Sequence, residues 1–146
     1  MDSTKPLLRR FFSIRPEIQF AYLFGSLTSG RTNPMSDIDI AIHIDPTSES
    51  FRDDPFHFEL SLKADLVAAL RTDRADLILL NHAPITLAHQ VLRRGILIFS
   101  RSETARVNHF VSVSSLFPDI RRMLEVHYRN TLRRIDAGEF GRPARG

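Results

Sequence analysis

The sequence contains no Cys, no Trp and no long run of apolar residues. The lack of Cys excludes disulfides and thiolate metal sites, as expected in a reducing compartment such as the cytosol. No apolar run approaches the roughly 18 residues that a membrane-spanning helix needs, and residues 1–10 lack the apolar stretch of a signal peptide. At 146 residues, 42% hydrophobic and 25% charged, the chain has the size and composition of one globular domain. We therefore expect a single soluble, cytoplasmic domain over residues 1–146, without membrane association.

Lysine is also scarce, because the 20 basic residues are 18 Arg and only two Lys, Lys5 and Lys63. The planar guanidinium pairs well with phosphate and carboxylate, so the Arg content favours acidic ligands or partners. A general bias toward Arg in the source genome explains it equally well. The segment 121–146 holds seven Arg against three acidic residues, which indicates an acidic partner surface without requiring one.

Helix and strand patterns alternate along the chain and predict an α/β (α+β) fold. The strongest pattern is in residues 37–44, where Ile occupies every second position as in a strand with one apolar face. Residues 45–55 are polar and predict a loop. The expected elements are helices over 6–14, 56–70 and 84–94, strands over 18–24, 37–44, 75–80 and 96–99, and a helical C-terminus over 103–135 that is interrupted or kinked at Pro118. They predict a small mixed sheet of about four strands flanked by helices.

Three carboxylates stand out in these strands. Asp37 and Asp39 are two residues apart, so they project from the same face of a strand, roughly 7 Å apart. Carboxylates without His or Cys suit a hard ion, Mg²⁺ or Mn²⁺. Asp76 opens the apolar strand 75–80, and it would complete a three-carboxylate metal site if the two strands are neighbours. In the alternative interpretation, Asp37 and Asp39 cap a strand end and Asp76 faces solvent.

The segment between the first two predicted strands has the composition of a phosphate-binding loop. Gly25 permits close backbone approach, and Ser26 offers a hydroxyl and a backbone N–H to an anion. Arg31 could add a phosphate contact. Residues 25–32 also have the spacing of a P-loop with Arg in place of Lys. The Asn-Pro pair at 33–34 and the following strand leave no room for the helix that a P-loop requires.

Together these residues resemble the nucleotidyltransferase superfamily that includes DNA polymerase β. The motif is Gly25-Ser26 followed by Ser36-Asp37-Ile38-Asp39, with a later strand Asp at 76. The segment ADLILLNHAPITLAHQVLRRGILIF is similar to the minimal, MntA-like branch of that superfamily. The likeness covers residues 18–99 well and the helical region 103–136 more loosely. It implies a single minimal nucleotidyltransferase domain with its core over 18–99.

The resemblance implies transfer of a nucleoside monophosphate from a nucleotide such as ATP, with pyrophosphate leaving. Two Mg²⁺ ions, or Mn²⁺ in their place, would be held by three residues that are also catalytic: Asp37, Asp39 and Asp76. The nucleotide would be bound by Gly25, Ser26, Arg31 and Ser36. Many relatives carry a basic residue at the position of Ser29, and here Arg31 would have to substitute for it.

Minimal members of this kind are similar to antitoxins paired with HEPN-domain toxins. The resemblance implies that this chain neutralises such a toxin by transferring AMP to one of its tyrosines, in a hetero-oligomer and without direct contact with nucleic acid. One alternative is an antitoxin that only binds and blocks its partner. Another is nucleotidyl transfer to a small-molecule hydroxyl such as that of an aminoglycoside. The helix over 117–135 would either dock the partner or pack on its own domain.

Overall fold

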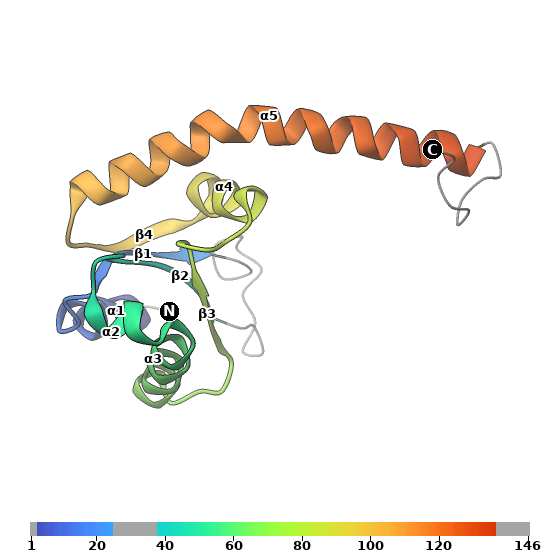
Figure 1. Ribbon diagram of the computed structural model, residues 1–146. Helices are drawn as coiled ribbons and strands as arrows, with labels where there is room; N and C mark the ends of the chain where they lie inside the picture. The colour runs from blue at the N-terminus through green and yellow to red at the C-terminus, as the bar shows by residue number, and fades with distance from the viewer. Residues whose placement is uncertain (1–2, 25–37, 137–146) are drawn as a thin grey trace.

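Helices and strands alternate in residues 3–24 and 38–136, the parts of the chain that the computed structural model describes (Figure 1). Their order follows the sequence prediction, with one added helix. The elements are α1 (Thr4–Ser13), β1 (Ile18–Phe24), β2 (Ile38–Ile44), α2 (Glu49–Asp53), α3 (Pro55–Leu70), β3 (Ala75–Leu79), α4 (Ile85–Arg94), β4 (Ile96–Ser100) and α5 (Glu103–Asp136).

The four strands form one mixed sheet in the order β3-β2-β1-β4. β1 pairs antiparallel with β2 and with β4, whereas β2 and β3 are parallel. A parallel pair needs a long crossover, which α2 and α3 supply between β2 and β3. This confirms the predicted α/β class and the small mixed sheet.

Helices cover both faces of the sheet, with α1, α2 and α3 on one side and α4 and α5 on the other (Figure 1). On the α1–α3 side, the isoleucines of β2 pack with Phe12 and Leu66 in the larger apolar cluster. On the other side, Ala41 packs with Phe20, Val91 and other residues in a smaller cluster. The strict alternation along β2 therefore sends its isoleucines to the larger core.

The predicted loop over residues 45–55 is wrong for its second half, which forms the short helix α2. Phe51 of α2 is only 5% exposed, and its ring lies edge-to-face on Phe58 and stacks on His82. A single apolar residue in a polar stretch gives no periodic signal, so the helix depends on this long-range packing rather than on local pattern.

α5 is one helix of 34 residues that passes through Pro118. Of the predicted interruption or kink at Pro118, the interruption is absent, and the kink stays a prediction. Pro118 and Ser114 are both exposed, so water can satisfy the carbonyl that loses its partner at a proline. Phe117 stacks on His89 of α4 with ring centroids 3.5 Å apart, and beyond that contact the helix runs clear of the sheet and of α4 (Figure 1). No helix of the described chain is both long and apolar enough to span a membrane.

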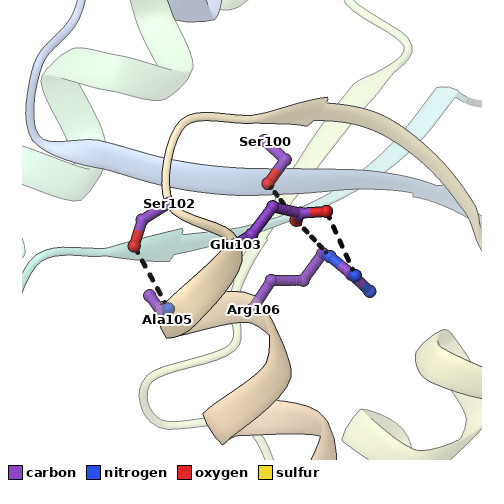
Figure 2. A network of polar contacts seen from close by, with 5 residues as sticks. All are labelled: Ser100, Ser102, Glu103, Ala105 and Arg106. Carbon is purple, nitrogen blue, oxygen red and sulfur yellow. Dashed lines mark hydrogen bonds and ion pairs between the residues drawn. The ribbon is translucent and has the colours of Figure 1, made fainter.

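Polar side chains fix the point at which α5 begins (Figure 2). The Ser102 hydroxyl accepts a hydrogen bond from the Ala105 N–H at 3.1 Å, as an N-cap residue does. The Glu103 carboxylate accepts bonds from Ser100 Oγ at 2.8 Å and from Arg106 Nε at 2.6 Å. Because Ser100 is the last residue of β4, this network ties the strand to the first turn of the helix.

Candidate functional site

Two of the three predicted carboxylates lie side by side. Asp39 is the second residue of β2, Asp76 is the second residue of β3, and the parallel register pairs them directly. Neighbouring strands are about 4.8 Å apart, and residues paired in register project on the same side of the sheet. The juxtaposition on which a shared metal site depends is thus present in the fold.

The end of β1 borders the same position. Phe24, the last residue of β1, pairs with Asp39 across the antiparallel ladder, so the chain leaves β1 directly beside that carboxylate. The remaining predicted site residues fall in the next segment, outside the described residues, and their roles stay predictions: Gly25, Ser26, Arg31, Ser36 and Asp37.

The alternation of β2 decides where Asp39 points. Ile38 and Ile40, on either side of it, pack in the larger cluster with α1 and α3, so Asp39 projects to the opposite face. Asp39 is half-buried, whereas the Asp76 side chain at the sheet edge is 56% exposed. Solvent therefore reaches Asp76 at the edge of the sheet and, less fully, Asp39 on the neighbouring strand.

Asp76 is held by a residue that the sequence did not single out. Lys63 of α3 lies with Nζ 3.1 Å from Asp76 Oδ1, and the Leu77 N–H donates to the same oxygen at 2.9 Å. Within the described chain no group donates to the other oxygen, Oδ2. The pair borders an open surface pocket of about 350 Å³ lined by Lys63, Asp73, Arg74, Ala75 and Asp76. In the sequence, Lys63 is distinguished only as one of two lysines, and nothing there indicates its contact with Asp76.

Among the described residues, the carboxylates of Asp39 and Asp76 are suitable ligands for a hard divalent ion. Asp39 and Asp76 contribute only oxygen, the ligand that Mg²⁺ and Mn²⁺ prefer, and a cation would offset the repulsion of two adjacent carboxylates. The described residues contain no group of three His, Cys, Asp or Glu arranged for a metal. The third predicted ligand, Asp37, lies outside them.

His43, on the same face of β2 as Asp39, is a packing residue. Its Nδ1 lies 2.8 Å from Gln19 Oε1, and its ring stacks on Phe20 with centroids 4.8 Å apart and meets His109 at 5.5 Å. Burial, with a smaller contribution from His109, lowers the pKa of His43 to about 4. It is therefore neutral at pH 7.

A family model described as polymerase beta, nucleotidyltransferase, matches residues 7–104. The chain belongs to the polymerase β nucleotidyltransferase family. The match spans all four strands and includes both Asp39 and Asp76. The resemblance carried by the Gly-Ser and Asp-x-Asp pattern is thereby confirmed.

Solved structures show the same fold. A chain of a toxin–antitoxin complex with AMP-PNP is 22% identical, with 88% of this chain and 98% of that chain covered and a TM-score of 0.71. A chain of the MntA–HepT toxin–antitoxin is 21% identical, with 90% and 99% covered and a TM-score of 0.67. A chain of the complex between tri-AMPylated Shewanella oneidensis HEPN toxin and MNT antitoxin is 23% identical, with 90% and 94% covered and a TM-score of 0.63. No curated protein matches the chain. The small mixed sheet with flanking helices is thus the nucleotidyltransferase fold.

Proposed function

We propose that this chain is a Mg²⁺-dependent nucleotidyltransferase of the cytoplasm that transfers AMP from ATP to a tyrosine of a HEPN-domain toxin and thereby acts as its antitoxin. The observation that carries the proposal is the direct pairing of Asp39 with Asp76 in a chain of this family. Support for the partner comes from the structures of similar fold, which include a complex of a tri-AMPylated HEPN toxin with its MNT antitoxin.

The two described carboxylates take different roles in this proposal. Asp39 and Asp76, together with Asp37, would hold the divalent ions, which when bound neutralise phosphate charge and polarise the reacting phosphate. Asp76 Oδ2 would accept the proton of the acceptor hydroxyl, since Oδ1 is already bonded to Lys63 and to the Leu77 N–H. The acceptor oxygen forms a bond to the α-phosphorus as the bond to the bridging oxygen breaks and pyrophosphate leaves. Gly25, Ser26, Arg31 and Ser36 would bind the triphosphate.

The test is to incubate the purified chain with Mg²⁺, α-³²P-labelled ATP and the product of the neighbouring gene, and to run a denaturing gel. We expect a labelled partner band with the wild type and none with Asp39→Asn or Asp76→Asn. Asp65→Asn is the matched control, because Asp65 is a 61% exposed carboxylate of α3 that pairs with Arg15 at 3.5 Å but lies away from the site. This variant should label the partner as well as the wild type does.

Other outcomes would replace the proposal with a different function. Tight partner binding without label from any nucleotide would establish an antitoxin that only blocks its partner. Undiminished labelling by Asp39→Asn would exclude these carboxylates from the chemistry. Label on a small-molecule hydroxyl without a partner would move the acceptor to another class.

A further inference from the structure

One flank of α3 carries large apolar side chains that nothing in the described structure covers. Phe56 is 75% exposed, the highest value among the large apolar side chains described, and Leu60 is 57% exposed. With Lys63 they occupy positions i, i+4 and i+7 of one helix, so the three form a continuous stripe along it. We call Phe56, Leu60 and Lys63 the α3 stripe.

The stripe is distinct from the side of α3 that packs on the domain. Leu62 and Leu66 face the sheet and are buried. The opposite flank is polar, where Asp65 pairs with Arg15 at 3.5 Å. A helix whose only task is to cover the sheet has a polar exposed surface, so the core does not account for Phe56 and Leu60.

The stripe ends at the candidate site. Lys63, its last member, bonds Asp76 at 3.1 Å. At a rise of 1.5 Å per residue, Phe56 lies only about 10 Å farther along the helix. α3 packs against β3, and β3 is the last described strand on its side of the sheet. The flank that carries the stripe therefore opens toward solvent next to Asp76.

We infer that the α3 stripe is the docking surface for the segment of the partner protein that carries the modified hydroxyl. The inference rests on the proposed function. A protein acceptor must bring its hydroxyl to Asp76, so the chain around that hydroxyl passes over the surface that adjoins Asp76, and on the α3 side this surface is the stripe. The occupant is a segment with bulky apolar side chains within a few residues of its tyrosine, to cover Phe56 and Leu60, and with an acidic side chain opposite Lys63.

Steady-state kinetics with the intact partner tests the inference. For the double variant Phe56→Ala, Leu60→Ala we expect KM for the partner protein to rise about tenfold or more, as truncation of central apolar contacts does, while kcat stays within about twofold. Binding of AMP-PNP, measured by calorimetry, should not change. Ile14→Ala is the matched control, because Ile14 is 70% exposed at the end of α1. It should change neither KM nor kcat.

A crosslinking experiment tests docking independently of catalysis. Since the chain has no Cys, Leu60→Cys provides a single thiol for a photoactivated crosslinker, and Ile14→Cys is its control. We expect the first to crosslink to the partner protein and the second not to. An unchanged KM in the double variant, or equal crosslinking from both positions, overturns the inference. A change in self-association of the double variant alone, seen by sedimentation, would assign the stripe to contacts between copies of this chain. Failure of the wild type to label the partner would instead refute the proposed function.

Discussion

One face of β2 is built of isoleucine alone, whereas the other carries Asp39, Ala41 and His43 in succession. Three of the four isoleucines have no exposed surface. On the other face the environment changes along the strand, from the half-buried carboxylate of Asp39 near its start, through the buried Ala41, to the neutral His43 beneath α5. The period of two thus separates residues that stabilise the fold from a residue placed for chemistry, within seven positions of one strand.

The largest effect on activity should come from substitution of the carboxylate on the polar face of β2. Asp39→Asn should lower the rate of AMP transfer by about 10³-fold or more, equivalent to about 4 kcal/mol of activation free energy. The melting temperature should change by only a few degrees, since Asn has nearly the same shape as Asp and Asp39 belongs to neither apolar cluster. Labelling rates and thermal unfolding of the same preparation check both parts. A rate within tenfold of the wild type would contradict the separation of the two faces.

A substitution on the apolar face should lower stability and leave activity unchanged, the reverse of the effect expected for Asp39. Ile42→Ala should lower the free energy of unfolding by about 3 kcal/mol, because it opens a cavity in the larger core. The transfer rate per folded molecule should not change. Urea unfolding, with Ile14→Ala as the exposed control expected to cost less than about 0.5 kcal/mol, measures the difference. A strong loss of activity in the folded fraction would show that the faces are coupled.

Acidification should lower the free energy of unfolding by protonating His43, which lies on the polar face of β2. Burial lowers the pKa of His43 from its ordinary 6.5 to about 4, so protonation favours the unfolded chain. The stability that depends on the neutral ring is present above pH 6.5 and is lost as the pH falls toward 4. By linkage, the free energy of unfolding at pH 5 should be about 2 kcal/mol lower than at pH 8. Burial lowers the pKa of His109 too, which acts in the same direction.

The controls for this pH dependence are substitutions of two histidines. His43→Phe keeps an aromatic ring against Phe20 and should weaken the dependence on pH. His57→Gln, at an exposed position of α3, should leave it unchanged. Denaturant unfolding at several pH values distinguishes them, and equal slopes for wild type and His43→Phe would exclude His43 as the source.

The smallest effect should come from the start of α5, the helix that covers the polar face. Ser102→Ala removes the bond from the Ala105 N–H and should cost about 1 kcal/mol. Ser115→Ala, at an exposed position within α5, is the control and should be close to neutral. A neutral Ser102→Ala would mean that the contacts of Glu103 alone define the helix start.

Local pattern predicted the strands well, because aromatic and β-branched residues cluster in β1 and alternate in β2. It could not predict α2, whose single buried Phe51 depends on partners in α3 and after β3. Alternation identified the face of β2 that carries His43, but it could not predict that α5 covers this end of the face. The pairing of Asp39 with Asp76 came from the resemblance, since the register of a parallel pair depends on how the α2–α3 crossover returns the chain. Lys63 was missed because a contact from helix to strand edge leaves no spacing in the sequence.

The strand order has a consequence for synthesis of the chain. β4 pairs with β1, so among the described strands the last to be translated completes the sheet beside the first. Both strands that carry the carboxylates of Asp39 and Asp76, β2 and β3, are translated by residue 79. The edge of β1 that pairs with β4 stays unpaired until residue 100 has emerged. An open edge invites pairing with other chains. A nascent chain that stalls between α4 and β4 thus already contains both carboxylates and still exposes the edge that β4 would close.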